Sequence, residues 1–372
     1  MKRITYVLLV ATCIAAGLQG CMPFKAVFRG HPDYRDSKRF PTNAIAAGNE
    51  VFHFQTTDKD WGKTIKVTDW TTDLPVFSTI QQVVAGHSTL AFLLIRKDTI
   101  LFEYYAEGST SKSQFPSYSI AKSFTSALIG IAIQEGFINS VDDPVKNYLP
   151  ELNFHPYFNQ LTLRHLLNQT SGIKYSLTQD AVIYYGRDIW KSVKRIEFDT
   201  TPGKIQSYLN INYLLLGMAL ETATGIAPHT YLEEKLWQPL GMETDAFWSA
   251  DNKNRKEKTF CCLNATAMDY AKFGRLYLHD GSWEGKQIIE QQWVNQSVSR
   301  DTTAGSSFGY NFGWHIGLLE YGDFMANGLY KQHIYINPKK ELIIVSLLRK
   351  EDKLKAERVN WWYVFRQISD QL

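Results

Sequence analysis

The 372-residue chain is poor in cysteine. It has four cysteines, of which only Cys261 and Cys262 lie beyond the first 21 residues, so a framework of several disulfides is excluded. Because adjacent cysteines rarely form an unstrained bridge, we expect these two as separate, buried, small apolar side chains. They have no further ligands at metal-like spacing, and no metal site is predicted.

The chain also lacks a strong charge of either sign. Its net charge is +3, and 21% of its residues are charged. The most basic stretch, residues 253–258 (KNRKEK), is interrupted by Glu257 and is typical of a solvated loop. The charge pattern therefore gives no reason to expect a nucleic-acid partner. Internal repeats and low-complexity tracts are absent as well, which excludes a solenoid.

The N-terminus has the pattern of an export signal. A positive head at residues 1–3 precedes an apolar run at residues 4–16, which is too short to span a bilayer comfortably. The tetrad Leu18-Gln19-Gly20-Cys21 resembles the bacterial lipobox, in which cleavage leaves a lipidated cysteine. We expect residues 1–21 to be a signal peptide, and Cys21 to anchor a protein secreted across the inner membrane. A plain signal peptide and a bare membrane anchor are the alternatives.

The rest of the chain is rich enough in apolar residues for a large core, at 44% hydrophobic and 14% aromatic. Residues 22–80 have no strong period and are predicted to be an N-terminal extension, whereas residues 81–372 form the main domain. Strands are predicted at 90–96, 99–105, 310–316, 332–336 and 342–348, and helices at 119–136, 265–278 and 358–368. Prolines break many helical patterns between about 137 and 260. This order predicts an α/β fold of the α+β type, in which helices flank an antiparallel sheet and an all-helical insertion leaves a cleft beside it.

A Ser-x-x-Lys pattern suggests a nucleophile and its base. It occurs at Ser109, Ser119 and Ser171, but only Ser119 opens a long helix with an apolar side. Residues three apart lie on one helix face, so the Lys122 amine can reach the Ser119 hydroxyl. Desolvation lowers the pKa of a buried lysine, and free N–H groups at a helix start can hold an oxyanion. The alternative is a helix-capping serine beside a lysine that extends into water.

A second candidate group is Tyr208-Leu209-Asn210, which precedes another apolar helix. A phenol can relay a proton between a serine and a leaving group, and the nearby amide can orient a substrate. The same Tyr-x-Asn pattern at residues 335–337 lies in an alternating strand and is predicted to be structural.

Six stretches carry a family resemblance, in this order: FPSYSIAKSFTSALIG, VDDPVKNYLPEL, LTLRHLLNQTSGI, TPGKIQSYLNINYLLLGMALETATG, LWQPLGM and NATAMDYAKFGRLYL. Over about residues 90–348 the chain resembles the serine β-lactamase and penicillin-binding protein superfamily. It is most similar to the class C-like branch, which includes esterases and aminohexanoate-dimer hydrolases. The resemblance implies that Ser119 is acylated, that Lys122 and Tyr208 act as a coupled base pair, and that Asn210 is the asparagine of the second motif. It implies no cofactor.

The chain departs from the third motif of that superfamily, which is Lys-Thr-Gly. Counting back from Pro338 without gaps places it near residues 323–325, which read Asp-Phe-Met. The missing lysine removes a cation for a β-lactam carboxylate, which disfavours antibiotic hydrolysis. The same count makes the Ala326 N–H the second oxyanion donor, after that of Ser119. Tyr175 is a candidate pocket residue, with a buried structural tyrosine as the alternative.

The sequence thus predicts a serine hydrolase that cleaves an ester or amide in a small molecule or peptide. The alternatives are a non-catalytic surface lipoprotein that binds cell-wall fragments, and a β-lactamase or D-alanyl carboxypeptidase. A Gly-x-Ser-x-Gly match at residues 305–309 is followed by Asp323 and His333 in the order of α/β-hydrolases. The segment after it reads as a strand rather than a helix, so a loop is predicted there.

Overall fold

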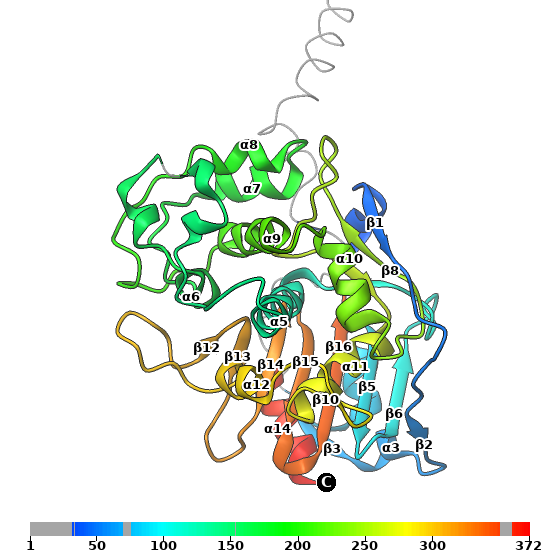
Figure 1. Ribbon diagram of the computed structural model, residues 1–372. Helices are drawn as coiled ribbons and strands as arrows, with labels where there is room; N and C mark the ends of the chain where they lie inside the picture. The colour runs from blue at the N-terminus through cyan, green and yellow to red at the C-terminus, as the bar shows by residue number, and fades with distance from the viewer. Residues whose placement is uncertain (1–31, 33, 70–75, 153, 350–358) are drawn as a thin grey trace, which may run out of the picture.

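The computed structural model describes residues 32, 34–69, 76–152, 154–349 and 359–372 (Figure 1). The predicted signal peptide and the predicted lipidation site, Cys21, lie outside the described residues. Within the described part of the chain, no helix combines the length and the apolar character needed to cross a bilayer.

An eight-stranded sheet forms the centre of the fold, in the order β12-β13-β14-β15-β16-β5-β6-β2. Neighbours from β12 to β6 are antiparallel, and β2 joins the edge in parallel. The strands are β2 (Gln55–Thr56), β5 (Thr89–Arg96), β6 (Thr99–Tyr105), β12 (Tyr310–Asn311), β13 (Trp314–Ile316), β14 (Phe324–Gly328), β15 (Gln332–Asn337) and β16 (Leu342–Leu348). The predicted hairpin of β5 and β6 is confirmed. The prediction of one strand over 310–316 is wrong, because a turn at Phe312 and Gly313 divides it into β12 and β13.

Both faces of this sheet are buried, which explains why its central strands read as continuous apolar runs. Along β5, Leu93 and Ile95 enter the larger core on one face, whereas Phe92 and Leu94 enter a second core on the other. Helix α11 (Ala267–Leu278) packs on the first face. Helices α4 (Ile80–Gly86) and α14 (Trp361–Asp370) contribute to the second core.

A helical region lies across helix α5 (Ala121–Gln134) from the sheet (Figure 1). Every residue of α5 from Ala121 to Ala132 is buried, because the helix packs between the two layers. The elements of this region are η3 (Val145–Asn147), η4 (Pro150–Leu152), η5 (Pro156–Asn159), α6 (Leu163–Leu167), α7 (Leu177–Tyr185), α8 (Ile189–Val193), α9 (Asn210–Thr224), α10 (Pro228–Leu232) and η6 (Glu233–Trp237). Helix α9 packs directly on α5.

Smaller elements complete the fold. The N-terminal β1 pairs with β8 in a four-stranded sheet of order β1-β8-β9-β7, which ties the start of the described chain to its middle. These elements are η1 (Tyr34–Lys38), β1 (Thr42–Ile45), α3 (Trp61–Thr64), β3 (Lys66–Asp69), β4 (Val76–Thr79), β7 (Phe115–Pro116), η2 (Tyr118–Ile120), β8 (Ala246–Ser249), β9 (Leu263–Ala265), β10 (Ser282–Trp283), β11 (Lys286–Gln287), α12 (Gln291–Ser297) and η7 (Pro338–Lys340).

The turn between β12 and β13 rests on the first turn of α5. Gly313 has a φ of +88°, and a Cβ added there would lie 3.0 Å from the carbonyl oxygen of Lys122. The Ser123 hydroxyl donates a hydrogen bond of 2.8 Å to the Gly313 carbonyl. The glycine therefore allows the sheet to approach α5 where the helix carries Lys122.

Candidate active site

Ser119 lies in the 3-10 turn η2, immediately before α5, rather than in the first turn of the α-helix itself. The residue before it, Tyr118, has a φ of +44°, a conformation that residues other than glycine rarely adopt. The Ser117 hydroxyl donates to the Tyr118 carbonyl at 3.0 Å, and the Ser117 N–H donates to the Leu263 carbonyl at 2.7 Å. These bonds hold the backbone that presents Ser119.

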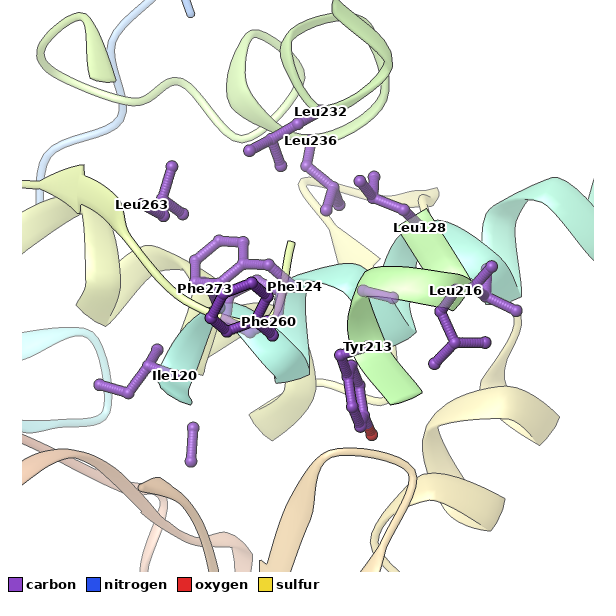
Figure 2. Close-up of a cluster of buried hydrophobic side chains, with 14 of the residues drawn as sticks. Ile120, Phe124, Leu128, Tyr213, Leu216, Leu232, Leu236, Phe260, Leu263 and Phe273 are labelled. Carbon is purple, nitrogen blue, oxygen red and sulfur yellow. The ribbon is translucent and has the colours of Figure 1, made fainter. Parts of the chain in front are cut away.

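The Lys122 amine lies one turn further along and reaches Ser119. Its Nζ is 2.9 Å from the Ser119 Oγ, 2.7 Å from the Asn210 Oδ1 and 2.9 Å from the carbonyl oxygen of Phe260. Lys122 is 0% exposed, and apolar side chains including Ile120, Phe124 and Phe260 surround this part of α5 (Figure 2). Burial lowers the pKa of Lys122 to about 7, while the charge of Asp180 raises it in part.

These three partners give the neutral amine a definite orientation. An ammonium donates to all three oxygens, but a neutral amine has only two N–H groups and a lone pair. The Asn210 Oδ1 and the Phe260 carbonyl can only accept, so the two remaining N–H groups go to them. The lone pair of neutral Lys122 therefore faces the Ser119 hydroxyl, as a general base requires.

Tyr208 comes from the loop before α9 and lies over the same amine. The Lys122 Nζ is 4.8 Å from the centre of the Tyr208 ring. Tyr208 is 47% exposed, and it lines a pocket together with Ser119. Although the residue as a whole is half exposed, desolvation of its hydroxyl end raises the pKa of Tyr208, and a hydrogen bond with the Ser119 side chain opposes that shift. The structure thus brings Ser119, Lys122 and Tyr208 together.

Asn210 is held in place by a carboxylate that the sequence did not reveal. The Asn210 Nδ2 donates to the Asp180 Oδ1 at 2.7 Å. This bond orients the Asn210 Oδ1 toward Lys122. The Tyr175 hydroxyl donates to the same carboxylate oxygen at 2.8 Å. Tyr175 is not among the described residues that line the pocket. It lies behind Asp180 as a partly buried member of the core.

These groups face a pocket of about 510 Å³ between the helical region and the sheet. Its described lining residues are Pro32, Tyr118, Ser119, Asp180, Tyr184, Tyr208, Asn210, Phe260, Cys261, His315, Asn327, Gly328 and Leu329. His315 comes from β13, and burial together with the nearby charge of Lys122 lowers its pKa to about 4. It is therefore neutral at pH 7.

The end of strand β14 and the residue after it form the sheet side of the pocket, through Asn327, Gly328 and Leu329. A Cβ added to Gly328 would lie 2.4 Å from the Ser117 carbonyl, so a glycine is required for this close approach. The structure does not bring Ala326 to the pocket: it is fully buried in the core and paired with Ile334. Residues 323–325, where the third motif was predicted, do not line the pocket either; residues 327–329 do. The absence of the motif's lysine does not depend on this shift, because residues 323–329 contain no lysine.

The N-terminal segment closes another side of the pocket. The Tyr330 hydroxyl donates to the Pro32 carbonyl at 2.5 Å, and the Tyr330 ring packs edge-on against Tyr118 with centroids 5.4 Å apart. Buried Asp36 accepts a hydrogen bond of 3.1 Å from the hydroxyl of Tyr184, a pocket residue on α7. Part of the predicted N-terminal extension therefore belongs to the pocket wall.

Cys261 and Cys262 form a disulfide with each other, so the expectation of two separate side chains is wrong. Both are buried, as expected. The backbone is also unusual here, because Cys262 has a φ of +69°, in the left-handed region that residues other than glycine rarely adopt. Cys261 also lines the pocket.

The alternative Ser, Asp and His set around residues 305–309 is not assembled. The Asp323 carboxylate accepts from the Arg366 guanidinium at 2.7 Å and from the Tyr335 hydroxyl at 3.0 Å. His333 is buried against Trp361 and Phe365. Burial lowers the pKa of His333 to about 3, so it carries no charge at neutral pH.

A second cavity of about 460 Å³ lies beside α7 and α8. It is lined by exposed Arg187, Lys191 and Arg195 and by apolar residues such as Val182, but it contains none of the catalytic candidates. Of these two cavities in the described part of the chain, the pocket at Ser119 is the one that combines a nucleophile with a buried base.

Several contributors to the pocket were not predicted from the sequence, among them Asp180, His315, Leu329, the Phe260 carbonyl and the Cys261–Cys262 disulfide. Asp180 stands in a helix with no motif around it, and His315 belongs to none of the sequence motifs. The adjacency of the two cysteines was the one visible signal.

This fold, in which a Ser-x-x-Lys pair begins a buried helix between a sheet and a helical region, is that of the serine β-lactamase and penicillin-binding protein superfamily. The chain belongs to the beta-lactamase family, whose pattern it matches over residues 76–368. It is thus a member of a hydrolase family.

Two kinds of relative support this assignment. The chain is 26% identical over 299 residues to a 6-aminohexanoate-dimer hydrolase of Paenarthrobacter ureafaciens, covering 72% of this chain and 74% of that protein. A solved Bacillus anthracis structure assigned to the 6-aminohexanoate-dimer hydrolases superposes with a TM-score of 0.78 at 24% identity, over 91% of each chain. A class C beta-lactamase mutant, in which a tyrosine is replaced by phenylalanine, superposes with a TM-score of 0.60 at 16% identity, over 78% of this chain and 95% of that one. The two structural matches confirm the predicted fold.

Proposed function

We propose that this protein is a serine hydrolase that cleaves an amide or ester through an acyl-enzyme on Ser119. The observation that carries the proposal is the contact of 2.9 Å between the Ser119 Oγ and the Nζ of a fully buried Lys122. At a pKa of about 7 a large share of Lys122 is neutral in ordinary buffers, with its lone pair available to the serine proton.

In the acylation step, the Ser119 oxygen attacks the substrate carbonyl carbon while Lys122 takes the serine proton. Tyr208 is placed to pass a proton to the leaving nitrogen or oxygen, so Lys122 and Tyr208 act as a coupled pair. Water then attacks the acyl-enzyme and releases the acid. The oxyanion sits between the N–H groups of Ser119 and Leu329, because Leu329 rather than Ala326 lines the pocket.

The charges around the pocket favour a substrate with a cationic end. Among its described lining residues, Asp180 is the one acidic side chain, and none is an arginine or lysine. A carboxylate next to the scissile bond, as in a β-lactam or a D-alanyl peptide, would find no cation there, whereas an ammonium at the end of a longer chain would find the Asp180 carboxylate. Together with the 6-aminohexanoate-dimer hydrolase relative, this supports a short linear amide with a free amino end over a β-lactam or a D-alanyl peptide.

A non-catalytic binding protein is disfavoured. Binding a cell-wall fragment requires neither a serine in contact with a lysine nor the burial of that lysine, which destabilises the fold.

The substrate class is tested by comparing hydrolysis of the 6-aminohexanoate dimer, the same dimer acetylated on its amino end, a short p-nitrophenyl ester and nitrocefin. Ser119→Ala is the matched control. We expect the free-amine dimer to be cleaved faster than its acetylated form, and no turnover by Ser119→Ala. Nitrocefin as the fastest substrate, or equal rates for wild type and Ser119→Ala, would contradict the proposal.

A further inference from the structure

The disulfide lies in the loop that supplies one of the oxygens around Lys122. Cys261 and Cys262 are bonded to each other between β8 and β9, directly after Phe260. The Phe260 carbonyl accepts from the Lys122 Nζ at 2.9 Å. Phe260 and Cys261 both line the pocket, so the disulfide is part of the wall of the candidate active site.

Four successive backbone carbonyls of this loop, those of residues 259–262, all accept hydrogen bonds. Two of them face one side of the loop and two face the other. Those of Thr259 and Phe260 face α5 and accept from the Thr125 hydroxyl at 2.7 Å and from Lys122. That of Cys261 faces β8 instead, and accepts from the Trp248 indole N–H at 2.9 Å.

The Cys262 carbonyl also faces β8, where it accepts from the Ser249 N–H at 2.9 Å. The chain therefore changes the side to which it offers its carbonyls between Phe260 and Cys261. The disulfide closes a small ring through the peptide that follows this change, and Cys262 holds a left-handed φ of +69°, which residues other than glycine rarely adopt.

We infer that the Cys261–Cys262 disulfide is a positioning element of the catalytic site, which fixes the Phe260 carbonyl against Lys122 and makes activity depend on the oxidised state of the two cysteines. The inference rests on the proposed function of Ser119 and Lys122. The Phe260 carbonyl is one of the two acceptors that turn the Lys122 lone pair toward Ser119. If the loop that contains Phe260 moves, the lone pair no longer points at the Ser119 hydroxyl.

Reduction releases this constraint. A dithiol reductant transfers two electrons and two protons to the S–S bond, which breaks into two thiols while the reductant closes its own disulfide. Cys261 and Cys262 then regain ordinary peptide freedom, and the left-handed backbone at Cys262 is no longer enforced. Because small misplacements of a catalytic group are costly, we expect serine acylation to slow by about 10- to 100-fold. The KM for substrate should change little, because Asp180 and β14 do not depend on this loop for their contacts.

The redox state is measured first. Unreduced protein is denatured and alkylated, and peptide mapping shows whether Cys261 and Cys262 carry the alkyl group before and after reduction. We expect protection before reduction and alkylation of both afterwards. Two free thiols in the unreduced protein would overturn the inference.

The functional effect is then measured as the rate at which a fluorophosphonate labels Ser119, and as kcat and KM for the best substrate of the panel. Oxidised wild type, dithiol-treated wild type and the Cys261→Ser/Cys262→Ser double variant are compared. We expect both of the latter to label slowly, the reduced wild type to recover on reoxidation, and the double variant to be insensitive to the dithiol. Near-UV circular dichroism is recorded on reduced wild type to establish that it is folded, so the test stands even if the double variant does not fold.

The outcomes separate the two proposals. Equal labelling of the oxidised, reduced and doubly substituted proteins overturns the role of the disulfide and leaves the serine hydrolase intact. A rise in KM with unchanged kcat also overturns it, because the loop would then act on binding alone. No labelling of folded, oxidised wild type overturns the proposed function, and this inference with it.

Discussion

Replacing Lys122 by methionine should change how the stability of the fold depends on pH. Burial lowers the pKa of Lys122 from 10.5 to about 7. Between these two values the unfolded chain binds one more proton than the folded chain at this residue, so the stability of the wild type rises with pH across that window. Methionine has a similar size but no titrating group.

The magnitude follows from the two pKa values. A fall from 10.5 to about 7 corresponds to about 5 kcal/mol of unfolding free energy. The whole of this penalty is present below pH 7 and disappears as the pH approaches 10.5. The difference in stability between wild type and Lys122→Met should therefore change by about 1.4 kcal/mol per pH unit within the window. In the variant, the Asn210 Oδ1 and the Phe260 carbonyl lose their hydrogen-bond donor, which destabilises the fold by about 1–3 kcal/mol for each acceptor. This loss shifts the difference in stability by a constant amount and leaves its dependence on pH unchanged.

Urea unfolding followed by tryptophan fluorescence at several pH values measures this slope. Subtracting the two curves removes the titration of the groups that do not interact with Lys122. Lys112→Met, which removes an exposed lysine, is the matched control. Parallel stability curves for wild type and Lys122→Met would refute the reasoning, because they would mean that Lys122 keeps its ordinary pKa in the folded protein.

Three further predictions concern the site and the anchor. Asp180→Asn removes the charge that raises the pKa of Lys122, so the acid limb of the kcat/KM profile should move to lower pH; an unmoved or raised limb would contradict the stated electrostatics. Tyr208→Phe should lower kcat by about 10²- to 10⁴-fold with little change in KM, as steady-state kinetics would show, and wild-type kcat would rule out a proton relay. Cys21→Ser should abolish labelling by radioactive palmitate in a bacterial host, whereas Cys13→Ser should leave it unchanged; labelling of Cys21→Ser would exclude the lipobox.

The sequence was most informative where function rests on local spacing. The hairpin of β5 and β6 follows from residue pattern, and so does the contact of Ser119 with Lys122, which needs only one helical turn. The long apolar run of β16 similarly reflects burial on both faces of the sheet.

Other features depend on contacts between distant segments, which no local pattern records. Asn210 meets Lys122 across 88 residues, and the Phe260 carbonyl meets it across 138. Asp180 enters the site only because α7 packs beside the start of α9. An ungapped count from Pro338 could not show which residues of β14 face the pocket. That depends on the close approach of Gly328 to the Ser117 carbonyl, a contact between distant segments.

The most direct test of the central claim is the site of covalent labelling by a fluorophosphonate, determined by intact mass and peptide mapping over a range of pH. We predict a single adduct on Ser119, which forms faster as the pH rises through about 7 and is absent from Ser119→Ala. An adduct on another serine such as Ser307, equal labelling of Ser119→Ala, or no adduct on folded protein would contradict the account.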